Sequence, residues 1–217
     1  MARKDRMGNR KTRDQRSKRR IPEMRYYLVV TDTEATECCF FTGLHNSLPE
    51  EMKQKLVIKV VETDTQDLIQ KCQELTAYDA QYRIPWIVFD RDQVVDFDQI
   101  VTRAEKAGIY AGWSNPCFEI WLFAYFGMMP VIQDSWTCCS KFAELYFRKT
   151  GHEYIKADKN VYMRLCEYGN EERALVIAEQ KYQQCMRDGK THPSTMCPAT
   201  RVYELVREIK SKVSQHV

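Results

Sequence analysis

The sequence predicts an α/β fold with a four-stranded, mostly parallel sheet, and three observations lead to this class. Short apolar runs rich in β-branched and aromatic residues recur along the first half of the chain. Each run is followed by a segment with apolar residues at helical spacing. Two of the runs end abruptly in acidic residues, as is expected where the carboxyl end of a buried strand emerges from the sheet. Four strand-to-helix units in succession imply right-handed crossovers, with helices on both faces of the sheet.

The predicted strands occupy residues 25–31, 56–61, 84–89 and 109–113. The helices after them run from Thr33 or Thr36 to Asn46, and over residues 64–78, 97–106 and 117–129. Asn115 and Pro116 are predicted to start the last of these helices, as N-cap and first helical residue. That helix is apolar nearly all round, which indicates a buried position.

From residue 135 onward the pattern is helical, with helices predicted over residues 140–150, 160–167, 171–187 and 199–213. These helices are expected to cover one edge or face of the sheet. The chain is therefore divided into a basic arm over residues 1–20, an α/β core over residues 21–134, and a helical C-terminal part over residues 135–217.

Composition excludes several classes of protein. Of the 217 residues 44% are hydrophobic, enough for a substantial core, yet no apolar run approaches the roughly 18 to 20 residues of a membrane span. The N-terminus is too basic and polar for a secretory signal. The nine cysteines include no C-x-x-C pair, and the four histidines are scattered. We expect reduced thiols packed as small hydrophobic groups in a cytoplasmic protein, with no membrane partner.

The net charge of +3 hides an asymmetry: residues 1–20 carry +8 and the other 197 residues carry −5. A basic arm with almost no apolar residues suits contacts with nucleic acid phosphates, for which Lys18, Arg19 and Arg20 are candidates. The alternative is a solubilising leader with no specific contact.

Carboxylates follow the predicted strands. Asp90 and Asp92 come directly after the third strand, and side chains at i and i+2 of an extended segment point the same way. Two neighbouring carboxylates remain ionised only if water or a cation screens them, and Mg²⁺ is a hard cation held by carboxylates and substrate phosphate. The alternative is a solvated loop between a strand and a helix.

Further acidic residues extend this prediction. Asp32, Glu34 and Glu37 follow the first strand, and Glu119 is the only charge in the apolar helix after the fourth. If the ends of the first, third and fourth strands lie together, Asp32, Asp90, Asp92 and Glu119 converge into a site for a divalent metal ion. Lys156 and Lys159 are candidates for phosphate contacts, and Ser114 and Asn115 either orient Glu119, contact substrate or serve only as caps.

Five blocks of the sequence resemble, in the same order, those of the RloB-like family. They are YYLVVTDTEATECCFF, PWIVFDRDQ, AGWSNPCFEIWLFAYF, YIKADKNVY and HPSTMCPATRVYELV. The family is grouped with the Toprim domains of topoisomerases, primases and OLD-type nucleases. The resemblance implies a three-layer Toprim-like domain that binds Mg²⁺ or Mn²⁺ for phosphodiester chemistry. Where the family usually has Glu-Gly after the first strand, this chain has Asp32-Thr33, so Glu34 or Glu37 is a possible substitute.

The resemblance also implies a function. RloB-like proteins are typically encoded beside an ABC-type ATPase (RloA-like) in systems of abortive infection and phage defence. The expectation is a metal-dependent nuclease acting on DNA or RNA, including transfer RNA, with the ATPase as partner. Asp32, Glu37, Asp90, Asp92 and Glu119 would be its catalytic residues. The alternative is a non-catalytic subunit that keeps the fold to bind nucleic acid or the ATPase, and a homo-oligomer is possible in either case.

Overall fold

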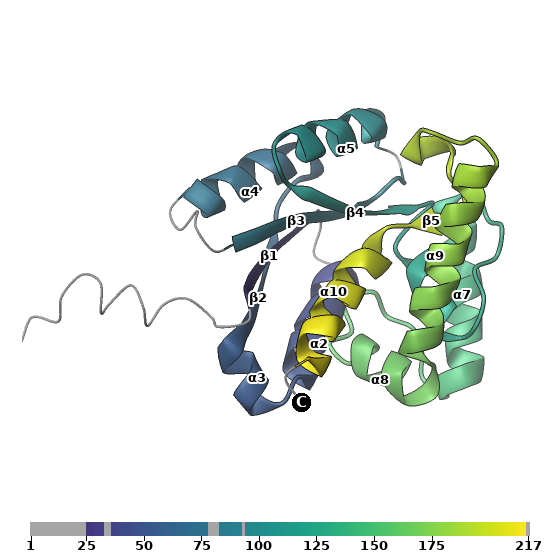
Figure 1. The fold of residues 1–217 in the computed structure, drawn as a ribbon. Coiled ribbons are helices and arrows are strands. Elements are labelled where there is room, and N and C mark those ends of the chain that lie inside the picture. The colour runs from purple at the N-terminus through teal and green to yellow at the C-terminus, as the bar shows by residue number, and fades with distance from the viewer. Residues whose placement is uncertain (1–24, 33–35, 78–82, 93, 216–217) are drawn as a thin grey trace, which may run out of the picture.

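A computed structural model describes residues 25–32, 36–77, 83–92 and 94–215. Figure 1 shows three layers, with helices on both faces of a central sheet. The sequence predicted this α/β class and its mostly parallel sheet, and the structure confirms both. The basic arm with Lys18, Arg19 and Arg20 lies outside the described residues, as does Glu34.

The sheet has five strands in the order β2-β1-β3-β4-β5. Their bounds are β1 Arg25–Thr31, β2 Leu56–Glu62, β3 Arg83–Asp90, β4 Tyr110–Asn115 and β5 Ala199–Thr200. The first four are mutually parallel, and β5 pairs antiparallel with β4. The sequence predicted four strands and missed β5, because two residues are too short to produce any periodic pattern.

Successive residues of β1 enter two separate cores. Tyr27 and Val29 lie in a large core on one face of the sheet, whereas Leu28 and Val30 lie in a smaller core on the other. All four side chains are fully buried. A strand covered on both faces needs a continuous apolar run rather than alternation, which is why β1 reads as RYYLVVT.

The helices in chain order are α2 Thr36–Ser47, α3 Glu50–Lys55, α4 Leu68–Ala77, α5 Phe97–Lys106, α6 Glu119–Tyr125, α7 Ser135–Thr150, α8 Val161–Tyr168, α9 Glu171–Arg187 and α10 Val202–Ser214, with short 3₁₀ turns η1 Thr65–Asp67 and η2 Pro193–Thr195. In Figure 1, α4 and α5 cover one face of the sheet, and α2 and α10 lie on the other. The predicted bounds of α5 and α9 agree with the structure.

The start of α6 differs from the prediction that Asn115 caps the helix and Pro116 begins it. The helix starts at Glu119 instead. Asn115 is still part of β4, where it pairs with Ala199. Its side-chain amide donates hydrogen bonds to the carbonyls of Pro193 and Ser194, both at 3.1 Å, so it holds the loop before β5 rather than a helix end.

Aromatic packing fixes the position of α6. The ring of Phe40 in α2 lies at the centre of a group of aromatic rings whose centroids are 5.2 to 6.3 Å away. These neighbours are Phe41, Phe118, Trp121, Tyr125 and Tyr162. Every residue of α6 is buried, as its composition predicted. A single helix turn carrying Glu119 is thereby held firmly against α2 and the sheet.

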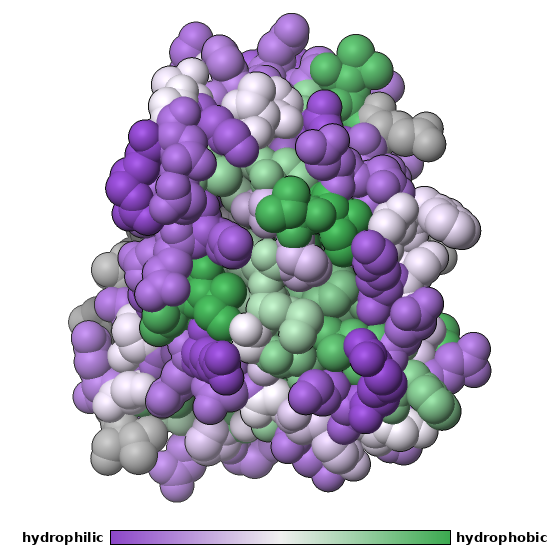
Figure 2. All heavy atoms as spheres, turned by 90° about the vertical axis from the view of Figure 1, so that its right-hand side faces the viewer, coloured by the Kyte–Doolittle hydropathy of each residue, from purple (hydrophilic) through white to green (hydrophobic). Residues whose placement is uncertain are grey.

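One face of the molecule exposes apolar side chains. Figure 2 shows apolar residues gathered near the middle of the face that lies to the right in Figure 1, where α7 and α9 lie. On α7, α9 and the loop before α7, the exposed large apolar residues include Val131, Trp136, Phe147 and Val176. Among the residues that the structure describes, no helix is both long enough and apolar enough to traverse a lipid bilayer.

Candidate functional site

The carboxyl ends of β1, β3 and β4 lie side by side, because these three parallel strands are neighbours in the sheet. Backbone hydrogen bonds continue the ladder past the strand ends. The amide of Asp32 donates to Val88 (3.3 Å), and the amide of Asp92 donates to Pro116 (3.0 Å). The acidic residues were predicted to converge only if the ends of the first, third and fourth strands lie together, and the strand order meets this condition.

Asp32 is the first residue after β1, and its side chain is buried. Burial raises the pKa of its carboxyl to about 6. The backbone amide of Asp32, the side chain of Thr65 and the backbone amide of Asp90 act in the opposite direction, and the charge of Asp92 raises the pKa further. The carboxyl of Asp32 is thus poised to exchange a proton near neutral pH.

Asp90 and Glu37 share the surroundings of Asp32. Asp90 ends β3, and its Oδ2 accepts a hydrogen bond from the backbone amide of Phe118 at 3.3 Å. Burial, followed by the charges of Asp32 and Glu119, raises the pKa of Asp90 well above its usual range. Glu37 is buried in the first turn of α2, where burial and then the charges of Asp90 and Asp32 raise its pKa well above its usual range.

Glu119 is 1% exposed in the first turn of α6. Its Oε1 accepts a hydrogen bond from the hydroxyl of Tyr154 at 2.9 Å, and the Nζ of Lys156 is 3.7 Å from the same oxygen. Burial alone would lower the pKa of Lys156, but the carboxylate of Glu119 raises it overall. Both contacts come from the segment between α7 and α8, so this segment closes over Glu119.

We call Asp32, Glu37, Asp90 and Glu119 the carboxylate cluster, because they are largely buried carboxyls whose charges act on one another. The other predicted residues lie differently. Asp92 is exposed and lies beyond β3, although its charge still raises the pKa values of Asp32 and Asp90. Lys159 is also exposed. Ser114 is fully buried and its hydroxyl is hydrogen-bonded to that of Thr200 at 2.9 Å, so it contacts β5 rather than Glu119.

The carboxylate cluster fits a hard cation held loosely. Mg²⁺ is usually bound by one or two carboxylates and keeps several waters, so it needs no dense cage of protein ligands. In the described part of the chain, no three carboxylates bring ligand atoms within 4.8 Å of one another. Burial, and after it the charges of neighbouring carboxyls, raises the pKa values of Asp90 and Glu37, and a divalent cation would offset both effects by favouring the ionised carboxylates.

A second group of ligating atoms meets at Glu119. Cys117, Glu119 and Cys139 each bring one ligand atom within 4.8 Å of the other two, and they form the only such group among the described residues. The Sγ atoms of Cys117 and Cys139 are 3.9 Å apart. This group was not predicted from the sequence, because the cysteines were expected to pack as small hydrophobic groups and no spacing pattern places Cys139 near Cys117. The C-x-E spacing of Cys117 and Glu119 was the one available signal.

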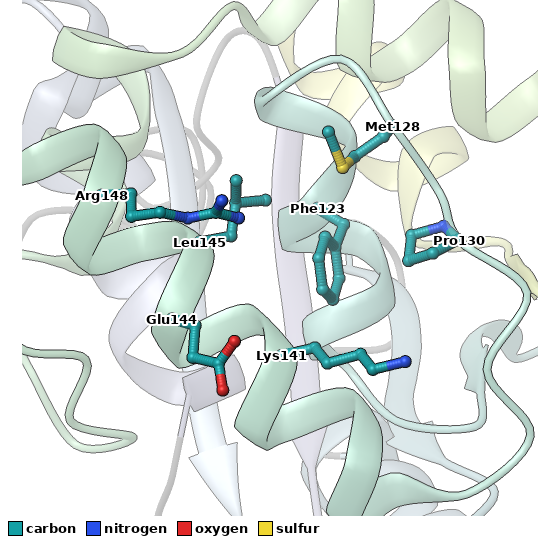
Figure 3. Close-up of a pocket in the computed structure, with 7 residues that line it drawn as sticks. All are labelled: Phe123, Met128, Pro130, Lys141, Glu144, Leu145 and Arg148. Carbon is teal, nitrogen blue, oxygen red and sulfur yellow. The ribbon is translucent and has the colours of Figure 1, made fainter.

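The structure also has an open hollow of about 270 Å³ between α6, α7 and the loop that joins them. Its lining residues are Phe123, Met128, Pro130, Lys141, Glu144, Leu145 and Arg148 (Figure 3). None of these residues belongs to the carboxylate cluster. The hollow is therefore a separate feature, on the part of the molecule where apolar residues are exposed.

Comparison with known proteins gives one match. The family model described as "RloB-like protein" matches residues 27–209, which includes every residue of the carboxylate cluster. No match was found among curated proteins or among solved structures.

Proposed function

The chain belongs to the RloB-like family, and from this premise we propose that it is a Mg²⁺-dependent nuclease of the Toprim type that cleaves phosphodiester bonds in DNA or RNA. The observation that carries the proposal is the meeting of acidic side chains at three adjacent strand ends. In open α/β sheets ligands bind at this edge, and buried carboxylates that repel one another suit a divalent cation.

Asp90 and Glu119 are the residues proposed to hold the cation directly. Asp92 and Asp32 would reach it through waters that the cation keeps, because no three carboxylates of the described residues lie close enough to bind one ion together. Bound Mg²⁺ or Mn²⁺ would neutralise the phosphate and lower the pKa of a bound water. Asp32, whose pKa is about 6, is suited to accept a proton near neutral pH. The side chain of Asp32 is one methylene shorter than the glutamate that the family usually has at this position. We propose that the buried carboxyl of Glu37 takes the part in proton transfer for which Asp32 is too short.

Basic residues are proposed to bind the nucleic acid backbone. Lys156 is the best placed, because its half-exposed side chain lies beside Glu119 at the edge of the cluster. Lys159 and the arm residues Lys18, Arg19 and Arg20 would add contacts that depend on salt but not on sequence. Transfer RNA is among the substrates to be tried.

The test is a cleavage assay with labelled DNA, RNA and transfer RNA in Mg²⁺ or Mn²⁺, alone and with the partner ATPase. Asp90→Asn keeps the shape of the side chain but removes its charge, so cleavage should fall on the order of 100-fold or more. Asp96→Asn is the matched control, because Asp96 is an exposed aspartate just beyond the same loop. Equal cleavage by both variants would rule out this site.

A non-catalytic subunit that binds nucleic acid or the ATPase is the second candidate. It is favoured by the contacts of Tyr154 and Lys156, which already satisfy Oε1 of Glu119 without any cation. Titration calorimetry separates the two candidates. Mg²⁺ binding that Asp90→Asn abolishes supports the enzyme, whereas nucleic acid binding with no Mg²⁺ dependence supports the binding subunit.

The partner and the setting rest on the family alone. We propose an effector of phage defence that acts with an ABC-type ATPase. The exposed apolar residues of α7, α9 and the loop before α7 offer a surface for such a protein. In a homo-oligomer, the same apolar surface would pack against a second copy of the chain. Co-purification with an RloA-like ABC-type ATPase, before and after Trp136→Ser, tests this surface.

A further inference from the structure

We propose that Cys117, Glu119 and Cys139 form a binding site for a thiophilic divalent cation such as Zn²⁺, distinct from the Mg²⁺ site but sharing Glu119 with it. The three side chains come from different parts of the fold. Cys117 lies in the connection between β4 and α6, Glu119 in the first turn of α6, and Cys139 in the second turn of α7. Their ligand atoms all lie within 4.8 Å of one another.

The geometry matches a tetrahedral zinc centre. With Zn–S bonds of about 2.3 Å, two thiolates on one zinc ion are separated by about 3.8 Å. The Sγ atoms of Cys117 and Cys139 are 3.9 Å apart. Two thiols that merely pack against each other reach a similar separation, so the distance between the Sγ atoms does not by itself indicate a metal site. The carboxylate of Glu119 beside them does, because packed thiols need no such neighbour.

The chemistry of the donor set distinguishes this site from the carboxylate cluster. Mg²⁺ prefers oxygen ligands, whereas thiolates select Zn²⁺ and similar cations. Binding releases the two thiol protons to solvent, so two thiolates and one carboxylate around Zn²⁺ leave a net charge of −1. Lys156, whose Nζ is 3.7 Å from Oε1 of Glu119, is placed to balance that charge.

Three protein ligands leave the fourth position of the ion to water. Cys117 and Glu119 are each 1% exposed, and Cys139 is half-buried, so a cation would enter from the side of α7. Zinc sites with an open position are the kind that bind and release further ligands, unlike the closed sites that only stabilise a fold. The site thus has the form of an open zinc centre rather than of a closed structural one.

The test uses the full-length chain, reduced and freed of metal, with Co²⁺ as a spectroscopic probe for Zn²⁺. Co²⁺ bound by thiolates absorbs through sulfur-to-metal charge transfer, and added Zn²⁺ should abolish that band as it displaces Co²⁺. The expected result is a charge-transfer band that saturates at about one Co²⁺ per chain, from one site of this type. Binding without such a band would overturn the proposal.

Variants locate the site. Cys139→Ser, at a half-buried position, and Cys117→Ser should each remove the band. Cys185→Ser is the matched control, because Cys185 is a buried cysteine on α9, outside the group. Circular dichroism establishes that each variant is folded. A band that survives in Cys139→Ser, or disappears in Cys185→Ser, would contradict the assignment.

A consequence for activity rests on the proposed nuclease function. Because Glu119 is shared, Zn²⁺ should draw it out of position for Mg²⁺ and slow cleavage by about 100-fold, the effect of a displacement near 1 Å. The measured quantity is the cleavage rate without Zn²⁺ divided by the cleavage rate with Zn²⁺, in each variant. That ratio should be large for the wild-type chain and Cys185→Ser, and close to one for Cys139→Ser. A chain that cleaves nothing refutes the nuclease and leaves the Co²⁺ test intact.

Discussion

The carboxylate cluster and the pair of thiols meet at Glu119, yet they are assembled in different ways. Asp32 and Asp90 are fixed by the ladder of the sheet, in which the amide of Asp32 donates to Val88 at the ends of β1 and β3. Cys139 arrives instead on α7, which docks by aromatic packing. The ring centroid of Phe142 is 5.2 Å from that of Phe123.

The ligand atoms of the two groups are therefore positioned by two different kinds of interaction. Strand ends are positioned by backbone hydrogen bonds, so oxygen ligands there vary little when side chains in the core repack. A helix held by ring contacts can shift by fractions of an ångström, because such contacts are less directional than a ladder. Glu119 depends on both, since α6 follows β4 and packs under α7.

Changing Glu119 should have the largest effect, because it is the only residue common to both groups. In Glu119→Gln we expect Mg²⁺-dependent cleavage to fall on the order of 100-fold or more, and Co²⁺ binding at Cys117 and Cys139 to weaken. Cleavage rates and Co²⁺ titrations measure the two effects separately.

The control for this change is Glu153→Gln, an exposed glutamate in the segment between α7 and α8. It should leave both measurements within about twofold, as exposed substitutions usually do. Loss of cleavage with unchanged Co²⁺ binding would show that the thiols do not share Glu119.

The next effect concerns stability and pH, through Asp32. Its pKa is raised from 3.8 to about 6 in the folded chain, so folding is favoured while the carboxyl is protonated. That contribution is complete below pH 4 and is lost as the pH rises through about 6. Without metal, Asp32→Asn should therefore be more stable than the wild-type chain at pH 8, by up to about 3 kcal/mol.

Urea unfolding in a metal chelator at pH 5 and pH 8 measures this difference. The advantage of Asp32→Asn should be larger at pH 8, and an advantage that does not change with pH would contradict the assigned cause. Mg²⁺ at about 100 times its dissociation constant should stabilise the wild-type chain by about 2.7 kcal/mol. The same addition should stabilise Asp32→Asn less.

The difference between the carboxylate cluster and the pair of thiols also explains which parts of the site could be predicted from the sequence. Asp32 and Asp90 follow apolar runs, and Glu119 is a single charge in an apolar helix, so local pattern identified all three. Their meeting depended on the order of the strands, which local pattern does not encode. It required β1, β3 and β4 to be neighbours, as the structure has them.

Other features lay beyond local pattern altogether. The docking of α7 brings Cys139 to Cys117 from 22 residues away. No spacing rule connects two cysteines whose approach depends on ring packing elsewhere. At Asn115 the local pattern was instead misleading. Asn is a good N-cap residue and was predicted to start a helix, but in the structure it belongs to β4 and pairs with Ala199. Tertiary pairing outweighed the local preference of Asn-Pro for a helix start.

The smallest expected effect concerns Lys156, which sharpens the comparison because it touches the shared carboxylate from outside. The ion pair with Glu119 leaves the lysine side chain 56% exposed, so Lys156→Gln should change the free energy of unfolding by less than about 1 kcal/mol. If Lys156 binds substrate phosphate, KM should rise about tenfold with little change in kcat, because that contact holds the ground state and transition state alike. Lys159→Gln, three residues away and exposed, is the control and should raise KM less. Equal changes in the two variants would mean that the lysines contribute only general positive charge, and that the contact with Glu119 gives Lys156 no special role.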